Sequence, residues 1–224
     1  MGLLSDPAGA VMNLIVLLLS LTVHEFSHAF TAWRLGDDTA ARMGRLTLNP
    51  VPHIDPIGTL LLPLMGAPIG WAKPVPVNPA RFRRGVKMGT GDILVSVAGP
   101  LSNLALGLLA AVIFGLVVRF APALVDSGEP ARALLIRFML VNSGLAIFNL
   151  LPIAPLDGSH VAENLMPYRL RDAWAKFAAI GPMLLLGLIA LESFAHVPLL
   201  SSLIGPPRRF IVTIYEHVVN GLAV

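Results

Sequence analysis

Four long apolar stretches dominate the hydrophobic pattern of the chain, and they occupy residues 9–34, 92–120, 133–156 and 176–195. Each stretch reaches the length of about 20 residues that an α-helix needs to cross a bilayer. A fifth stretch at 208–223 is shorter and contains Glu216 and His217, so it either spans the membrane or lies at its interface. The pattern predicts an all-α polytopic membrane protein with four to five transmembrane helices.

The loops between these stretches differ in charge, and this difference predicts the orientation of the helices. Region 36–90 contains seven basic residues, which are Arg42, Arg45, Lys73, Arg81, Arg83, Arg84 and Lys87. The loop at 121–131 contains no Lys or Arg. Because short basic loops stay on the cytoplasmic side, we expect 36–90 to be cytoplasmic and the N-terminus to lie outside. This topology also puts the segment around Asp157 on the cytoplasmic side of the cell membrane.

Region 36–90 contains two segments that are poor candidates for spanning helices. The first, "PIGTLLLPLMGAPIGW" at 56–71, is apolar but short and rich in Pro and Gly, which favours a re-entrant or membrane-surface element. The second, "WAKPVPVNP" at 71–79, alternates and is held extended by its prolines. The sequence therefore predicts a short re-entrant or β element at the cytoplasmic membrane surface.

Composition agrees with a membrane protein built as one unit. Hydrophobic residues make up 55% of the 224 residues and charged residues 13%, against roughly 25% charged residues in soluble domains. The apolar stretches nearly use up the chain, so we expect a single integral membrane domain over 1–224. The first stretch lacks the positively charged start of a signal peptide, and we expect it to be retained. Its natural surroundings are then the lipid bilayer.

Charge and cysteine content narrow the chemistry. The net charge is +3, but the basic residues are spread over loops without an aromatic-interleaved patch, so nucleic acid is not an expected partner. The chain contains no cysteine, which excludes disulfides and thiolate metal ligands. Any bound metal must therefore be held by nitrogen and oxygen atoms.

The first apolar stretch contains three ionisable residues in five positions, His24, Glu25 and His28. Such residues are costly in hydrocarbon and mark functional sites by default. On a helix the two histidines at i and i+4 share one face, so both can hold one metal ion. In this H-E-x-x-H arrangement the histidines bind zinc and the glutamate is the general base. A polar cluster joining helices is the alternative interpretation.

A catalytic zinc needs a third protein ligand. The metzincin continuation would place a histidine at position 34, which is Arg34. Asp157 is the better candidate, because it follows a spanning segment on the expected cytoplasmic side, after helix-breaking prolines in "FNLLPIAPLDGSH". Asp157 could instead cap a turn. His53 and Asp55, in a Pro-flanked loop, form a rival ligand pair. The loop could instead be a structural turn, or these residues could support the ligands or line the path of the substrate.

Three motifs in order resemble the site-2 protease family of intramembrane zinc metalloproteases. They are His24-Glu25-x-x-His28, "AGPLSN" at 98–103, and Asn149-x-x-Pro152 followed by Leu156-Asp157-Gly158. The resemblance covers a core of about 10–165, followed by C-terminal helices at 176–224. It implies one zinc ion bound by His24, His28 and Asp157, with Glu25 as the catalytic base.

The resemblance implies regulated intramembrane proteolysis, in which peptide bonds of transmembrane protein substrates are hydrolysed in the bilayer or at its cytoplasmic edge. Asn149 is either a donor to the substrate carbonyl or a core amide. We interpret Asn103 and Pro100 as packing and kinking elements, and we expect His160 to lie near the site. A metal transporter, in which the same residues line an ion pathway, is the alternative function.

Overall fold

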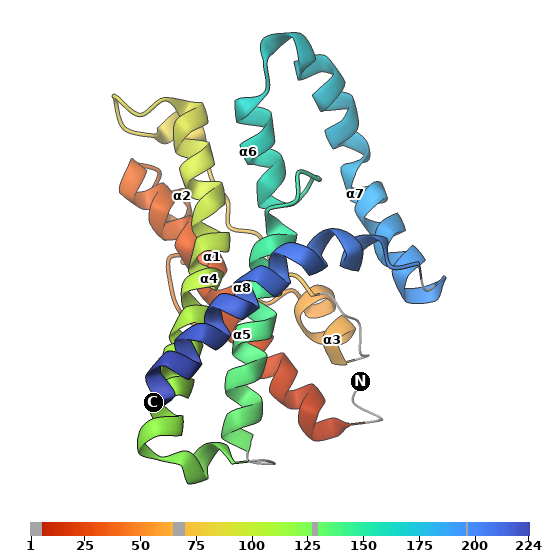
Figure 1. The fold of residues 1–224 in the computed structure, drawn as a ribbon. Coiled ribbons are helices and arrows are strands. Elements are labelled where there is room, and N and C mark those ends of the chain that lie inside the picture. The colour runs from red at the N-terminus through yellow and green to blue at the C-terminus, as the bar shows by residue number, and fades with distance from the viewer. Residues whose placement is uncertain (1–5, 65–69, 127–129, 196) are drawn as a thin grey trace.

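The computed structural model describes residues 6–64, 70–126, 130–195 and 197–224, and most of them belong to helices (Figure 1). Four helices are long and apolar enough to cross a membrane. They are α1 (Pro7–Leu35), α4 (Met88–Phe120), α5 (Pro130–Asn149) and α7 (Arg171–Phe194). The prediction of a polytopic helical membrane protein is confirmed.

Shorter helical elements connect the long helices. They are α2 (Thr39–Arg42), η1 (Val51–His53), η2 (Pro56–Leu61), α3 (Leu62–Leu64), η3 (Pro79–Arg81), η4 (Pro122–Val125), α6 (Asp157–Leu165) and η5 (Tyr168–Leu170). The last helix, α8 (Leu199–Ala223), begins nine residues before the predicted stretch at 208–223. It is not among the four candidate spans, because Arg208, Arg209 and Glu216 lower its hydropathy.

The prediction of a β element at 71–79 is wrong, because the described part of the chain contains no strand. Pro74, Pro76 and Pro79 have no backbone N–H, so this segment cannot form a regular ladder. Instead, the Val75 and Asn78 amides donate to carboxylates on or next to α1. In the apolar segment before it, 56–64 forms the helical turns η2 and α3 against α1, and 65–69 lie outside the described residues.

Local signals in the sequence set the ends of the helices around the site. The Asp6 side chain accepts a hydrogen bond of 2.9 Å from the Gly9 amide and caps α1, with proline at the first helical position. At the other end Gly36 has a φ of 111°, which ends α1 in a left-handed turn that favours glycine. Helix α5 ends at Asn149, because Pro152 disfavours helical backbone at the residue before it.

Helices α1, α4 and α5 pack together, and α8 crosses α4 and α5 obliquely (Figure 1). Small residues on α4 allow the close approach of α8. A Cβ atom at Gly107 would lie 2.6 Å from the Tyr215 hydroxyl, and one at Gly115 would lie 2.7 Å from the Leu222 Cβ. The buried Tyr215 hydroxyl donates to the Leu104 carbonyl at 2.9 Å. Small residues of this kind commonly mediate helix contacts in membranes.

This packing predicts opposite effects for two glycine-to-alanine substitutions. Gly107→Ala should destabilise the protein by about 1–3 kcal/mol, because the added methyl group meets the Tyr215 ring. Gly187→Ala on α7 meets nothing within 4 Å and should be neutral or stabilising by up to about 1 kcal/mol through helix propensity. Thermal unfolding of both variants in detergent tests this, and equal stabilities would contradict the packing of α8 on α4.

Candidate metal centre

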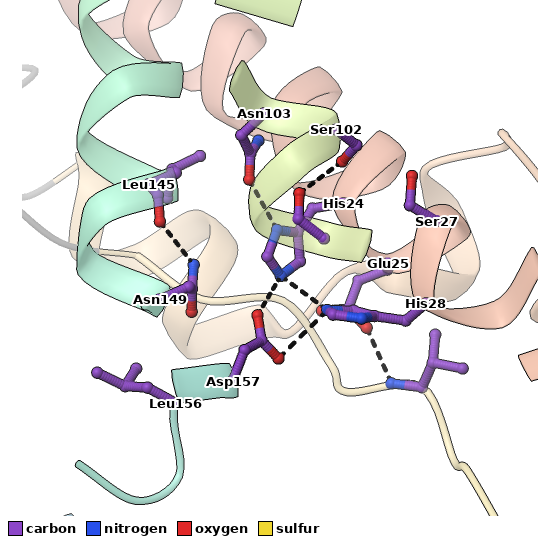
Figure 2. Close-up of polar contacts among 12 residues, drawn as sticks. His24, Glu25, Ser27, His28, Ser102, Asn103, Leu145, Asn149, Leu156 and Asp157 are labelled. Atoms are coloured by element: carbon purple, nitrogen blue, oxygen red, sulfur yellow. Dashed lines mark hydrogen bonds and ion pairs between the residues drawn. The ribbon is translucent and has the colours of Figure 1, made fainter. Parts of the chain in front are cut away.

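His24 and His28 lie on one face of α1, directed at the same point in the bundle (Figure 2). Both side chains are buried, with relative exposures of 4% and 7%. The Nε2 atoms of the two rings are 3.0 Å apart. This is the contact that i, i+4 spacing on a helix makes possible.

Asp157 approaches these nitrogens from the first turn of α6. Its Oδ2 atom lies 3.2 Å from His24 Nε2, and its Oδ1 atom lies 3.3 Å from His28 Nε2. Asp157 Oδ2 is buried and accepts no hydrogen bond within the described chain. Burial raises the pKa of the Asp157 carboxyl, and the two histidines, when they are protonated, lower it by more than burial raises it. The ionised carboxylate brings a negative charge to the two rings.

The loop before Asp157 is fixed by apolar packing and by one glycine. Ile153 and Leu156 are buried against Leu185 of α7, in a cluster of apolar side chains at the end of α5. A Cβ atom at Gly158 would lie 2.2 Å from the Leu150 carbonyl oxygen. Only glycine therefore allows the first turn of α6 to lie against this loop. The prolines predict only that the helix ends before Asp157. The apolar packing and the glycine contact then fix where Asp157 lies.

The outer nitrogen of each imidazole has its own partner. His28 Nδ1 lies 2.7 Å from the Val95 carbonyl oxygen, and His24 Nδ1 lies 2.7 Å from Asn103 Oδ1. A carbonyl oxygen only accepts, so each Nδ1 carries the proton and donates it. In the neutral rings the lone pairs are therefore on the Nε2 atoms, which face each other and Asp157.

This donor set fits a zinc ion. Ligand atoms around a tetrahedral zinc lie about 3.3–3.6 Å apart, given zinc–ligand distances of about 2.0–2.2 Å. The three contacts measured here are 3.0, 3.2 and 3.3 Å. Two imidazoles and one carboxylate leave a fourth position open, which is typical of catalytic rather than structural zinc sites. His24, His28 and Asp157 could therefore hold one ion.

Helix α4 lies directly against the two imidazoles at Gly99. A Cβ atom at this position would lie 2.4 Å from His28 Nε2 and 2.6 Å from His24 Cε1. Any larger residue would displace the rings or enter the space between them. The sequence showed Gly99 only as part of "AGPLSN", and the reason for a glycine here is visible only in the packed helices.

Glu25 is buried on the same helix, and its carboxylate is held from outside α1. Its Oε2 atom accepts a hydrogen bond of 2.9 Å from the Val75 amide. In Figure 2 this bond runs from Glu25 to the extended segment that passes the site. Because one carboxylate oxygen accepts this bond, the other is available to a reacting group. No pattern in the sequence pointed to Val75.

The segment that carries Val75 is anchored on both sides. The Lys73 amide donates to the His53 carbonyl at 2.9 Å, and the Asn78 amide donates to Asp37 Oδ2 at 2.6 Å. Asp37 is fully buried next to the end of α1. Burial raises the pKa of Asp37, but hydrogen bonds from the Asn78 amide and from Thr39 lower it further, so it stays ionised.

His53 and Asp55 do not join the metal-ligand cluster. The buried His53 ring lies 2.9 Å from the Thr47 carbonyl and 3.5 Å from Arg45 Nη2. Asp55 Oδ1 accepts hydrogen bonds from the amides of Ile57 and Gly58, so Asp55 caps η2. These contacts are structural, and His53 reaches the site only indirectly, through Lys73 and the Val75 segment.

Two further predicted residues lie near the cluster. Asn149 is half-buried at the end of α5, where its Nδ2 atom donates to the Leu145 carbonyl at 3.0 Å (Figure 2). His160 lies one turn after Asp157, and its Nδ1 atom is 3.5 Å from Asp92 Oδ2. This contact raises the pKa of His160. Neither residue is part of the group formed by His24, His28 and Asp157.

Comparison with known proteins agrees with this chemistry. The sequence profile of Peptidase family M50 matches residues 123–189. The chain is 37% identical over 191 residues to "Putative zinc metalloprotease YwhC" of Bacillus subtilis, covering 84% of this chain and 85% of the relative. The chain therefore belongs to Peptidase family M50, the site-2 protease family, and is a membrane metalloprotease whose family implies zinc as the metal.

Two mycobacterial relatives match a smaller part of their own length. The chain is 35% identical over 152 residues to "Putative zinc metalloprotease Rip2" of Mycolicibacterium smegmatis, and 37% identical over 146 residues to the protein of the same name in Mycobacterium tuberculosis. Each match covers 65% of this chain and 54% of the relative. No solved structure matches the chain significantly.

The geometry predicts different results for two aspartate variants. Asp157→Ala should lower the bound zinc sharply, because it removes the carboxylate beside both Nε2 atoms. Asp55→Ala should cost about 0.5–2 kcal/mol of stability through the lost cap but leave the zinc content nearly unchanged. Metal analysis of purified protein checks both, and the reverse pattern would show that Asp55 rather than Asp157 is the third ligand.

Proposed function

We propose that this membrane metalloprotease performs regulated intramembrane proteolysis. Its substrates are transmembrane proteins, and it cleaves them within the bilayer of the cell membrane or at its cytoplasmic edge. The observation that carries the proposal is the convergence of His24 and His28 on the apolar helix α1 with Asp157 at the start of α6, beside the buried Glu25. A protease with this site inside its membrane domain acts most directly on substrates that share the membrane.

The depth of the site supports a membrane substrate. His24 is 17 residues after Pro7, so it lies about 25 Å along α1 from the first residue of the helix. A hydrocarbon core is about 30 Å thick, so a helix that enters the core near Pro7 would bring the histidines close to the opposite boundary. Basic residues of region 36–90 follow the nearer end of α1, which supports a site towards the cytoplasmic side.

The residues have separate roles in peptide hydrolysis. When bound by His24, His28 and Asp157, one zinc ion per chain supplies Lewis-acid polarisation of the scissile carbonyl and makes a water acidic enough to react. Glu25 accepts the proton of that water and delivers it to the leaving amine. The Val75 amide holds Glu25 Oε2 and leaves Oε1 to take the proton. Asn149 has a second amide hydrogen that can donate to the substrate carbonyl.

The substrate must change its conformation before it can react. All backbone amides of a transmembrane helix are paired within the helix, and they cannot be left unsatisfied in lipid. A scissile bond therefore becomes accessible only where the substrate helix has unwound. Polar groups near a membrane boundary, such as Asn149 and the Val75 segment, offer partners to the backbone that unwinding exposes.

Glu25→Gln separates catalysis from metal binding. The substitution is nearly isosteric, and glutamine still accepts the Val75 hydrogen bond but cannot accept the proton of water. It should keep the zinc content and the thermal stability, and it should lower the cleavage rate by about 10²–10⁴-fold. Zinc content, unfolding temperature and cleavage of a single-span substrate are measured on one preparation. Glu163→Gln, on the exposed side of α6, is the matched control and should cleave normally.

The same variant, with metal uptake into reconstituted vesicles measured as well, distinguishes the alternative functions. A transporter would carry metal ions into vesicles in a manner largely insensitive to Glu25→Gln, and a structural polar cluster would make the variant unstable. Wild-type cleavage rates in a zinc-loaded Glu25→Gln protein would contradict the proposed mechanism.

The proposed topology predicts which loops react with an impermeant thiol reagent. The chain has no cysteine, so each introduced cysteine reports only its own position. Arg84→Cys, in the exposed loop before α4, should be labelled only from the cytoplasmic side. Asp126→Cys, in the loop between α4 and α5, should be labelled only from outside. The reverse labelling would place the metal centre near the outer face.

A further inference from the structure

A chain of buried amides connects His24 to the backbone of α5. Asn103 Oδ1 lies 2.7 Å from His24 Nδ1, and Asn103 Nδ2 donates to Asn142 Oδ1 at 2.9 Å. Asn142 Nδ2 then donates to the Phe138 carbonyl and to the Ser20 hydroxyl, both at 2.9 Å. The side chains of Ser20, Asn103 and Asn142 have a relative exposure of 0%. Water therefore does not compete for these bonds.

The donor-to-acceptor direction of these amide hydrogen bonds is set where they reach α5, at the Phe138 carbonyl. A backbone carbonyl only accepts hydrogen bonds, so the Phe138 carbonyl requires the NH₂ group of Asn142 on its side. The Asn142 oxygen then faces Asn103, which must present its own NH₂ group. The Asn103 oxygen is left for His24, and His24 must carry its proton on Nδ1. A longer contact of 3.4 Å from Asn103 Nδ2 to the Ser20 carbonyl favours the same orientation.

The two histidines therefore obtain the same tautomer by different means. The Nδ1 proton of His28 is fixed directly by the Val95 carbonyl. For His24 the partner is a carboxamide, which could rotate by 180° and present its NH₂ group instead. The ring would then keep its lone pair on Nδ1 and carry the proton on Nε2, where the metal has to bind.

We propose that Asn142 is a positioning residue of the metal centre. It prevents the rotation of Asn103, and it thereby keeps the His24 Nε2 lone pair available to the metal without contacting any of the three ligands. This inference rests on the proposed role of His24 as a zinc ligand. Residues that orient the ligands of a metal in this way are typically worth about 10–100-fold in metal affinity.

Asn142→Ser tests the proposal. A serine hydroxyl can bond the carbonyl four residues before it, as Thr22 and Ser27 do on α1, so no new unpaired group is introduced at position 142. The side chain is too short to hold Asn103. Zinc affinity should fall about tenfold, the lower end of the range, because the Ser20 carbonyl still favours the native orientation. In the metal-free protein, the ¹⁵N spectrum of the His24 ring should change from the Nδ1–H form to a mixture of tautomers.

A second substitution should reverse the effect. In the Asn103→Asp/Asn142→Ser double variant, residue 103 has no N–H group, and as a carboxylate beside the imidazole N–H it can only accept from His24 Nδ1. The Nδ1–H tautomer and the zinc affinity should both return. The matched control is Ser143→Ala, at a fully buried polar residue next to Asn142 whose one hydrogen bond within the described residues goes to the Leu140 carbonyl of its own helix. This variant should keep the wild-type tautomer and zinc affinity.

A folded Asn142→Ser protein with the wild-type tautomer and zinc affinity would overturn the proposal, as would a double variant that is not rescued. If Asn142→Ser does not fold, Asn142→Asp decides, because a buried carboxylic acid keeps one donor and one acceptor in the native direction. It should retain the Nδ1–H form, and a different tautomer would overturn the proposal. A wild-type protein that bound no zinc would contradict the proposed function, while the tautomer measurement would still decide the role of Asn142.

Discussion

Two imidazole lone pairs and a carboxylate meet at one point inside an apolar helix bundle. The Nε2 atoms of His24 and His28 are 3.0 Å apart, and Asp157 lies within 3.3 Å of each. Groups of this kind repel one another unless a cation lies between them, and burial in a membrane makes the repulsion stronger. The surrounding structure has to hold them together, and a cation bound between them would supply the compensating interaction.

Most of the groups that hold the two histidines and Asp157 in place carry no charge. Gly99 lets α4 approach the imidazoles, Gly158 lets the first turn of α6 approach the loop before it, and the Val95 carbonyl and Asn103 accept the outer protons of the rings. Backbone groups and amides suit a membrane interior, because they orient ligands without adding further ions to a medium of low dielectric constant. A backbone carbonyl and a carboxamide thus take the place of the carboxylates that often orient metal-bound histidines in soluble enzymes.

The polar residues of region 36–90 act through the extended segment beside the site. Asp37 and the His53 carbonyl bind the backbone of this segment on either side of Val75, and Val75 in turn holds Glu25. His53 was expected near the metal, and it contributes instead by fixing the segment that orients the proposed base. The prolines prevent a regular strand, and they also leave few N–H groups in the segment, of which one is directed at Glu25.

The sequence by itself determined the membrane-spanning helices and the pairing of His24 with His28, because hydrophobic length and i, i+4 spacing are local properties. It also indicated Asp157, through the proline break and the family motif. It did not determine the contacts that orient these groups. Asn142 lies 118 residues after His24 along the chain, and Val75 donates through its backbone, which no side-chain pattern reveals. Only the packing of α1, α4 and α5 decided these partners, since long-range contacts depend on which helix faces meet.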